Sequence, residues 1–368
     1  MSHLYESELN ALKRSGRYRE RKLIDPELID AASNDYLGLA HNPHLHAKAC
    51  ETLSHYDEHA PKASMLVNGY HPIHAAFEKA LCDANGFEAG IVMGSGFNAN
   101  VGLIEALVRK GDLLLMDEEY HASGIAGARM CEGEVVFFAH NDPESLKEGL
   151  SRAGGRRTIV AVEGIYSMGG DRLDRDIIEL AMAHGALLIL DEAHSSGVIG
   201  EYLMGILDYY DIPPTPLMIK MGTLGKAYGS FGAYVLSSQH ISDYLINRAK
   251  NVIYATAPSL YDTALAHHAL EYIQTHVQEL KVSISLRQSI VREVLGIECA
   301  GLIVPIEIGD NRQVMQWQTW FRENLGMQVG AIRQPTVKRA IIRLIIRLDI
   351  EESVLRSACE RFRAIWVK

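Results

Sequence analysis

Side chains with acid, base or nucleophile chemistry follow four short apolar runs of the sequence. The runs are residues 113–116, 159–162, 187–190 and 218–221, and they are followed by His121, by Glu163 and Ser167, by Asp191 and His194, and by Thr223 and Lys226. Ligands of an open parallel sheet bind beyond the carboxyl ends of its strands. One polar residue there is usually a cap or a turn residue. Four such places in succession predict a shared reactive edge.

The residue types at this edge match the needs of pyridoxal phosphate. A buried Asp191 can keep a heteroaromatic nitrogen protonated, His194 can bond a phenolic oxygen, and a desolvated Lys226 can form a Schiff base. The protonated ring of this cofactor is an electron sink, and a flat imidazole such as His121 can stack on it. A hydroxyl such as that of Thr223 can bind its phosphate. The sequence therefore predicts a pyridoxal phosphate site.

Lys226 has a second interpretation, because it closes the glycine-containing stretch 222–226. In that interpretation it is a surface lysine of a mobile loop. Asp191 lies 35 residues upstream, which leaves room for one strand–helix–strand step of a parallel sheet. This spacing favours a joint site for Asp191 and Lys226.

Two motifs suggest other ligands. Residues 191–194 spell the DEAH box of helicases, which works beside a GxxxxGK[ST] loop. In this sequence Lys220 stands where that loop needs Gly, and Ala227 stands where it needs Ser or Thr. A helicase is therefore disfavoured. Residues 94–99 fit G-x-G-x-x-G/A, with Asp117 at the distance of a ribose contact. A dinucleotide ligand therefore remains an alternative. More generally, the motif predicts that a phosphate binds at a helix N-terminus.

Histidine and cysteine patterns indicate no metal centre. Histidines recur at 41/44/46, 55/59 and 71/74 without Cys or carboxylate partners at fixed offsets. The five cysteines are scattered and form no CxxC pair, so they encode neither a zinc cluster nor a disulfide framework.

Composition and charge exclude several classes of protein. The 368 residues include 36 Lys+Arg and 46 Asp+Glu, a formal charge of −10, and the size favours an enzyme. Nucleic-acid binding is disfavoured because no long basic run stands out. No apolar stretch approaches the roughly 18 residues that span a membrane, and the first ten residues lack the apolar core of a signal peptide. We expect a cytoplasmic protein.

Strand and helix patterns alternate from about residue 30 to 250, which predicts a parallel α/β sheet. A helix is expected over 72–81, where Pro opens the first turn and apolar residues recur at helical spacing. The expected strands are 89–93, 113–117, 135–138, 158–163, 186–191, 217–221 and 231–236.

The pattern changes after residue 258 and predicts a smaller α+β domain. It contains a long helical stretch over 261–291, strands near 301–308 and 341–348, and a closing helix that carries apolar residues from 354 to 365 on one face. The expected segments are 1–45 as an N-terminal part that contributes to the site, 46–258 as the large domain and 259–368 as the small domain.

Six motifs together resemble those of the α-oxoamine synthases. They are residues 33–39 (SNDYLGL), 94–97 (GSGF), 121–123 (HAS), 163–168 (EGIYSM), 191–200 (DEAHSSGVIG) and 223–226 (TLGK), and the resemblance runs almost end to end. These fold-type I pyridoxal-phosphate enzymes condense an amino acid with an acyl thioester and lose CO₂. The resemblance implies a large, mainly parallel seven-stranded sheet domain with a smaller C-terminal α+β domain.

Site residues carry over by matching position. The resemblance implies Lys226 as the Schiff-base lysine and general base, and Asp191 as the partner of the pyridine nitrogen. It implies homodimers whose sites lie at the interface. The other implied contacts are His194 and Ser167 at the ring oxygen, His121 on the ring face, Gly96 and Phe97 in the phosphate turn, Thr223 near the phosphate, Thr256 on the cofactor of the partner subunit, and Arg19, Asn34 and Thr336 on the substrate.

The residues after 337 depart from the family pattern, in which the second of two arginines spaced by one residue holds the substrate carboxylate. Ungapped counting puts Ile345 there, and Ile cannot bind a carboxylate. A turn shortened by two residues puts Arg343 at this position, and Arg347 is the alternative. Two further positions depart from the family pattern. Ala255 stands where a Ser or Thr is usual, and Gln334 stands where a Pro is usual.

Residues 331–337 and 138–142 are similar to the family branch that condenses L-alanine with a pimeloyl thioester in biotin biosynthesis. The resemblance implies this activity, with acyl carrier protein or coenzyme A as the thiol carrier. The alternatives are sister activities that use glycine, of the aminoketobutyrate ligase or aminolevulinate synthase type. A non-catalytic partner subunit is disfavoured because Lys226 is present.

Overall fold

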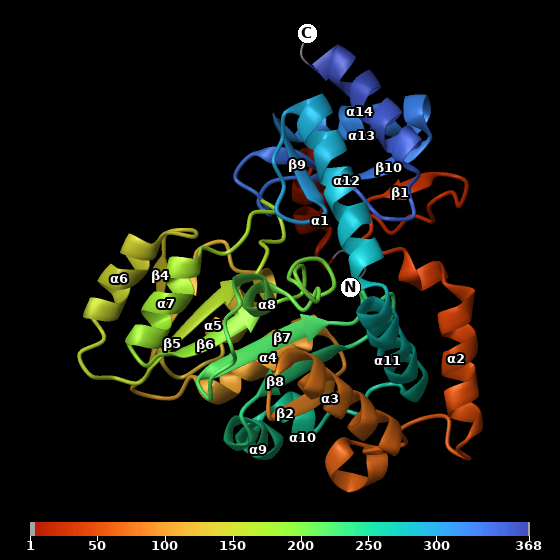
Figure 1. The fold of residues 1–368 in the computed structure, drawn as a ribbon. Helices are drawn as coiled ribbons and strands as arrows, with labels where there is room; N and C mark the ends of the chain where they lie inside the picture. Colours follow the sequence, from red (N-terminus) through yellow and green to blue (C-terminus); the bar gives the residue numbers. More distant parts are fainter. Residues whose placement is uncertain (1–3, 367–368) are drawn as a thin grey trace. The chain divides into compact units, whose positions relative to one another are not determined.

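The computed structural model describes residues 4–366, which fold into two compact units (Figure 1). The sheet unit comprises Asp35–Ser167 and Asp171–Ser285. The terminal unit comprises the chain up to Asn34, Met168–Gly170 and the chain from Leu286 onward.

The boundaries of these two units differ from the domain boundaries expected from the sequence. Helix α11 (Leu260–Thr275) packs on α2 (Pro43–Ser54) and α3 (Pro72–Asn85), so the chain stays with the sheet unit well beyond residue 258. The segments expected from the sequence were 1–45, 46–258 and 259–368, and their assignment as functional domains stays a prediction.

Seven strands form the sheet of the sheet unit, in the order β2-β8-β7-β6-β5-β3-β4. Strand β8 is antiparallel to both neighbours, and the other neighbouring pairs are parallel, so β2 runs in the same direction as β7. The predicted mainly parallel seven-stranded sheet is confirmed. The strands are β2 (Ala89–Met93), β3 (Leu113–Asp117), β4 (Glu134–Phe138), β5 (Thr158–Glu163), β6 (Leu187–Asp191), β7 (Met218–Thr223) and β8 (Ala233–Ser237).

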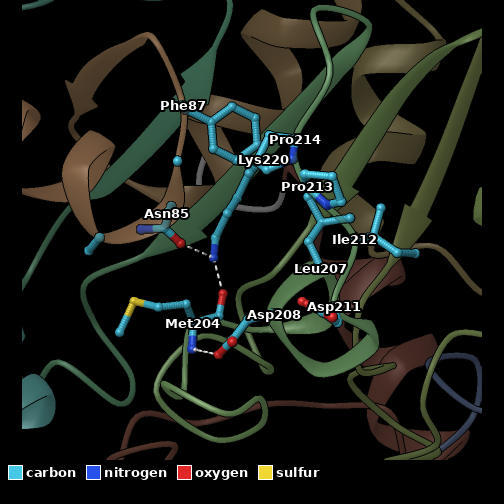
Figure 2. Close-up of a pocket in the computed structure, with 12 residues that line it drawn as sticks. Asn85, Phe87, Met204, Leu207, Asp208, Asp211, Ile212, Pro213, Pro214 and Lys220 are labelled. Carbon is cyan, nitrogen blue, oxygen red and sulfur yellow. Dashed lines mark hydrogen bonds between the residues drawn. The ribbon is translucent and has the colours of Figure 1, made fainter.

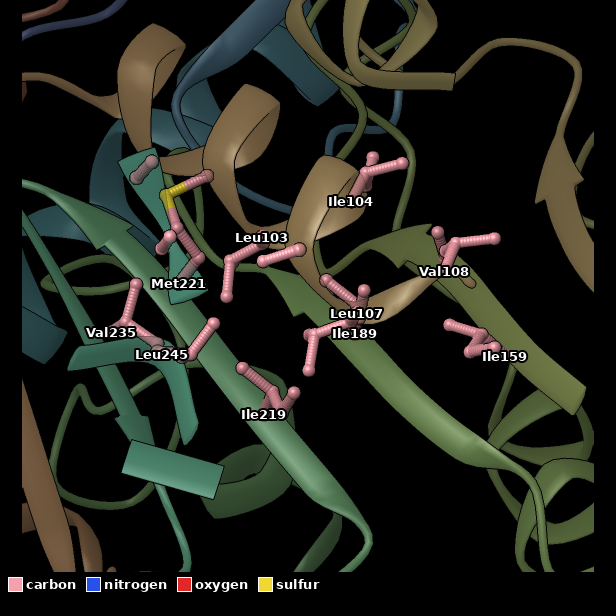
Figure 3. Packing of buried hydrophobic residues seen from close by; sticks show 14 of the residues in the cluster. Leu103, Ile104, Leu107, Val108, Ile159, Ile189, Ile219, Met221, Val235 and Leu245 are labelled. Carbon is pink, nitrogen blue, oxygen red and sulfur yellow. The ribbon is translucent and has the colours of Figure 1, made fainter. Parts of the chain in front are cut away.

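Apolar side chains from helix α4 (Gly96–Leu107) pack against one face of this sheet. Leu103 and Leu107 of α4 lie in one buried cluster with Ile189 of β6 and Ile219 of β7 (Figure 3). Each fully buried aliphatic side chain stabilises the fold by about 1.5–3 kcal/mol. This packing fixes α4 relative to the strand ends. The other helices of the unit are α5 (Ala122–Ala128), α6 (Pro143–Ser151), α7 (Arg175–Ala183), α8 (Ile206–Tyr210), α9 (Gln239–Arg248) and α10 (Lys250–Ile253).

A four-stranded sheet in the order β1-β10-β11-β9 forms the centre of the terminal unit. The patterns predicted β9 and β11 but not β1 and β10. Strand β1 has three residues and pairs in parallel with β10 from the other end of the chain. The elements are β1 (Ile29–Ala31), β9 (Ile303–Gly309), β10 (Met327–Ile332), β11 (Ala340–Ile345), α1 (Glu6–Arg14), α13 (Asn311–Leu325) and α14 (Glu352–Trp366).

The helix expected over 261–291 is instead two helices, α11 and α12 (Val277–Leu295). His276 separates them with φ −109° and ψ 19°, outside the helical region. Its Nδ1 lies 2.9 Å from the carbonyl oxygen of Tyr272. Local bonding of this kind competes with continuation of a helix.

Candidate active site

The four predicted strand ends meet at one edge of the seven-stranded sheet. Strands β7, β6, β5 and β3 are consecutive and parallel, so the residues that follow them lie side by side. Glu163 at the end of β5 pairs in register with Asp191 at the end of β6. The shared edge is confirmed; which ligand each residue contacts stays a prediction.

Asp191 is buried and held in one orientation. It is 4% exposed, and its Oδ1 accepts the backbone N–H of Ala193 at 3.0 Å. Its Oδ2 accepts the side-chain N–H of Asn100 at 2.7 Å, and Asn100 also donates to Ser123 Oγ at 3.0 Å. Tyr120 fixes the Asn100 amide, because its hydroxyl donates to Oδ1 at 2.9 Å. These contacts hold the Asp191 carboxyl group in place.

Lys226 and His194 contact each other directly. Lys226 Nζ lies 2.6 Å from His194 Nε2, and His194 Nδ1 lies 2.5 Å from the hydroxyl of Tyr36. The imidazole therefore positions the lysine amine, and Tyr36 positions the imidazole.

His121 lies at the N-terminus of α5 as a neutral imidazole. Burial lowers its pKa, and the nearby Lys226 adds to this while Asp191 opposes it. Its Nδ1 accepts the backbone N–H of Ser123 at 3.3 Å, so the neutral ring carries its proton on Nε2. A neutral ring that is fixed at one nitrogen suits stacking on a flat ligand.

Glu163 adds a second buried carboxyl beside Asp191. Burial and the neighbouring Asp191 carboxylate raise its pKa well above its usual range. Its Oε2 accepts the backbone N–H of Ser167 at 3.0 Å, which fixes the loop that carries the Ser167 hydroxyl. The buried Glu163 carboxyl therefore lies next to Asp191 at the end of the neighbouring strand.

The predicted phosphate turn lies at the N-terminus of α4. Ser95 caps the helix by accepting the Asn98 N–H at 3.3 Å, and the N–H groups of Gly96 and Phe97 belong to the first turn, which lacks intrahelical acceptors. A Cβ at Gly96 would lie 3.5 Å from Cβ of Thr223, so β7 and α4 meet here. Thr256 lies exposed on the segment between α10 and α11.

These groups fit pyridoxal phosphate. A 12-residue helix offers its N-terminal N–H groups and positive dipole end to a phosphate. Asp191 supplies an oriented carboxylate for a protonated ring nitrogen, His194 and Ser167 supply polar groups for a phenolic oxygen, and Lys226 supplies the amine. Among the residues described, no cluster of three or more His, Cys, Asp or Glu is arranged to hold a metal ion.

The four residues predicted to bind substrate lie in the terminal unit, where they form two pairs. Arg19 Nη2 donates to Thr336 Oγ1 at 3.3 Å, and Arg343 Nη1 donates to Asn34 Oδ1 at 2.9 Å. Each pair joins residues more than 300 positions apart in the sequence.

Arg347, the alternative to Arg343, is bound to carboxylates of its own unit. Its guanidinium forms ion pairs with Asp30 and, at 2.6 Å, with Asp349, and it donates to Ser33 Oγ at 2.8 Å. The Arg347 side chain is 2% exposed, and its contacts link β1 to the segment that follows β11. These contacts favour Arg343 as the anion-binding arginine.

A charged network connects the segments that follow β3, β4 and β5. His140 contacts Asp117 Oδ1 at 3.0 Å and Asp171 Oδ2 at 3.1 Å, and the Tyr166 hydroxyl donates to Asp117 Oδ2 at 2.7 Å. Burial lowers the pKa of His140, but the hydrogen bonds to the two carboxylates outweigh this and raise it to about 10. His140 is therefore an imidazolium at neutral pH.

Replacing His140 with glutamine is expected to lower the free energy of unfolding by about 1.5–3 kcal/mol near neutral pH, the usual range for hydrogen bonds to charged groups. The folded pKa of about 10 exceeds the ordinary value of 6.5, so the stabilisation is complete below pH 6.5 and is lost as the pH rises towards 10. Urea unfolding of wild type and variant at both ends of this range measures the difference.

The matched control is His184→Gln, because His184 is exposed and its Nδ1 lies 2.9 Å from a backbone carbonyl, that of Leu180 in the adjoining helix α7. We expect no such change in this variant. An equal gap between wild type and His140→Gln at both pH values would contradict the assignment of a protonated His140.

A cavity of about 450 Å³ lies elsewhere in the sheet unit (Figure 2). Lys220 lines it and donates to Asn85 Oδ1 at 2.7 Å and to the carbonyl of Met204. Ile219 and Met221 pack in the α4 cluster, so Lys220, between them on β7, points to the opposite face of the sheet. Burial lowers the pKa of this lysine and the nearby Glu192 opposes the shift. The cavity is separate from the reactive edge.

Asn100 and Tyr36 contact predicted site residues, and neither was assigned a role from the sequence. Asn100 is 1% exposed on α4 among Ala99, Leu103 and Ile104. A polar residue on an otherwise apolar helical face was the available signal. Tyr36 lies in one of the motifs shared with the α-oxoamine synthases, but only the fold reveals its contact with His194.

Residues 26–362 match the aminotransferase class I and II family. An 8-amino-7-oxononanoate synthase of Helicobacter pylori strain J99 is 44% identical over 94% of this chain and 93% of that protein. The enzyme of the same name from Alkalilimnicola ehrlichii is 33% identical over 95% of this chain and 93% of its own.

Two solved structures have the same fold. A serine palmitoyltransferase from S. paucimobilis has a TM-score of 0.87 and 24% identity, covering 98% of this chain and 96% of that one. An 8-amino-7-oxononanoate synthase from Francisella tularensis has a TM-score of 0.76 and 24% identity, covering 92% and 98%. At this identity the likeness concerns the fold alone.

Proposed function

Because the chain belongs to the aminotransferase class I and II family and, within it, to the pyridoxal-phosphate-dependent α-oxoamine synthases, we propose that it condenses L-alanine with a pimeloyl thioester. The products are 8-amino-7-oxononanoate, CO₂ and the free thiol carrier, in a step of biotin biosynthesis. The observation that carries this proposal is the identity of 44%, over 94% of this chain, with a curated synthase of that name.

Pyridoxal phosphate, when bound, withdraws electrons from the amino-acid Cα and so makes its proton acidic. The carboxylate of Asp191 holds a proton at the ring nitrogen, and Asn100 and Ala193 keep that carboxylate in place. Lys226 supplies the amine that removes the Cα proton. His194, 2.6 Å from this amine, holds it in position.

We assign the substrate carboxylate to Arg343, supported by its bond to Asn34 and by the ion pairs that already occupy Arg347. An arginine binds a carboxylate through two parallel N–H groups. Arg19 and Thr336 form the second polar pair that we assign to substrate.

The amino-acid substrate is tested by the absorbance of the bound cofactor. L-Alanine is expected to shift the spectrum of the holoenzyme, and glycine at the same concentration is expected to leave it nearly unchanged. A spectrum that shifts with glycine alone would assign the chain to a sister activity and overturn the choice of L-alanine.

We propose a homodimer with Thr256 acting on the cofactor of the second copy. Large apolar side chains near the phosphate turn and Thr256 support this, since Phe97 is 53%, Phe231 62% and Tyr254 78% exposed. Exposed apolar groups of this size mark interaction surfaces. Light scattering is expected to give about twice the chain mass of 40.8 kDa, and a monomer at assay concentration would refute the proposal.

A further inference from the structure

Two segments of the terminal unit are basic although the whole chain is acidic. Residues 13–22 contain six basic residues and one acidic residue, Glu20, whereas the chain has 36 Lys+Arg and 46 Asp+Glu. Residues 333–339 add three more basic residues and no acidic one. Apart from the half-buried Tyr18, the residues of 13–22 are exposed.

The fold joins these segments into one surface. Arg333 Nη1 donates to the carbonyl of Gly16 at 2.5 Å, and Arg19 Nη2 donates to Thr336 Oγ1 at 3.3 Å. The carboxylates beside them are paired, Glu20 with Lys22 at 3.6 Å and Glu307 with Arg339 at 2.9 Å. We call residues 13–22 and 333–339 the basic surface.

We infer that the basic surface docks an acidic acyl carrier protein that presents the pimeloyl thioester. The inference rests on the proposed function and names the carrier. Arg19 and Thr336, which we assign to substrate, lie within this surface, so a carrier seated here releases its acyl arm beside them. Complementary charge also accelerates encounter between proteins.

The form of the surface favours a protein over coenzyme A. Coenzyme A carries its charge on three phosphates, whereas the basic residues here extend from the last turn of α1 along the irregular segment 17–22 and onto a second segment. Helix α1 adds exposed apolar side chains next to them, since Leu9 is 45% and Leu12 41% exposed. Apolar groups beside charged ones are typical of protein interfaces.

The test combines Arg14→Glu, Arg17→Glu and Arg21→Glu in one holoenzyme, which leaves Arg19 intact. We expect the KM for the pimeloylated carrier protein to rise about tenfold or more at low salt. We expect little change with pimeloyl-pantetheine or pimeloyl-coenzyme A. High salt should raise the wild-type KM for the carrier protein towards that of the variant.

The control variant combines Lys48→Glu, Lys110→Glu and Arg152→Glu, three exposed residues of the sheet unit, and changes net charge equally. The inference would be overturned if the control variant showed an equal rise in the KM for the carrier protein. It would also be overturned if the KM for the coenzyme A or pantetheine substrates rose equally, or if the KM for the carrier protein did not change. Binding of the unacylated carrier protein, followed by fluorescence anisotropy, does not depend on turnover. Wild type that binds the carrier but makes no product from any pimeloyl thioester would refute the proposed function and leave the docking surface standing.

Discussion

Enzyme in which Lys226 is replaced by alanine is expected to lose at least about 10³-fold of its turnover, in the upper part of the range for a general base. The amine of Lys226 lies 2.6 Å from His194 at the edge where β7 ends. No other lysine is present among the residues that we assign to this edge, so the Cα proton has no replacement acceptor of the same kind.

Lys226→Arg is the matched variant, because arginine keeps the positive charge but does not deprotonate in proteins. Both variants should therefore be inactive, and both should unfold at urea concentrations close to that of wild type. Turnover within tenfold of wild type in either variant, measured with saturating cofactor, would show that Lys226 is not the base.

The second large effect is expected for Asp191→Asn, with a loss of about 10²–10³-fold in kcat, as for removal of one preorganised electrostatic group. Asparagine keeps the shape of the side chain, but its neutral amide cannot stabilise a proton on the ring nitrogen. In addition, both carboxylate oxygens of Asp191 accept hydrogen bonds, one from Asn100 and one from Ala193. The NH₂ group of asparagine takes the place of one of these oxygens and cannot accept that bond.

Asn100→Ala separates charge from orientation at Asp191. This variant keeps the carboxylate and its bond to the Ala193 N–H but loses the bond to Oδ2. Its loss in kcat should be clearly smaller than that of Asp191→Asn, and the absorbance of its bound cofactor should stay closer to wild type. Equal losses in the two variants would contradict a role for the negative charge.

The reactive edge could be predicted because its information is local. An apolar strand followed by a polar residue can be recognised within one short stretch of sequence. Because neighbouring strands of the sheet are parallel, their ends lie at the same edge, which places Glu163 beside Asp191. The predicted end of β6 at Asp191 matches the structure, and the end of β7 differs by two residues, because Gly222 and Thr223 continue the pairing with β8.

Contacts between distant residues could not be predicted in this way. The bond of Asn100 to Asp191 joins residues 91 positions apart, and the bond of Arg343 to Asn34 joins residues 309 apart. Strand β1 is too short to show a period, and it exists because β10 supplies its partner. Which acids surround His140, and hence its raised pKa, also depends on the fold alone.

Product formation is the decisive test of the proposed activity. Purified holoenzyme is mixed with L-alanine and pimeloyl thioesters of acyl carrier protein and of coenzyme A, and the products are identified by mass spectrometry. We expect 8-amino-7-oxononanoate, with one CO₂ and one free thiol released for each molecule formed. Product from glycine but not from L-alanine, or no condensation with either pimeloyl thioester, would contradict it.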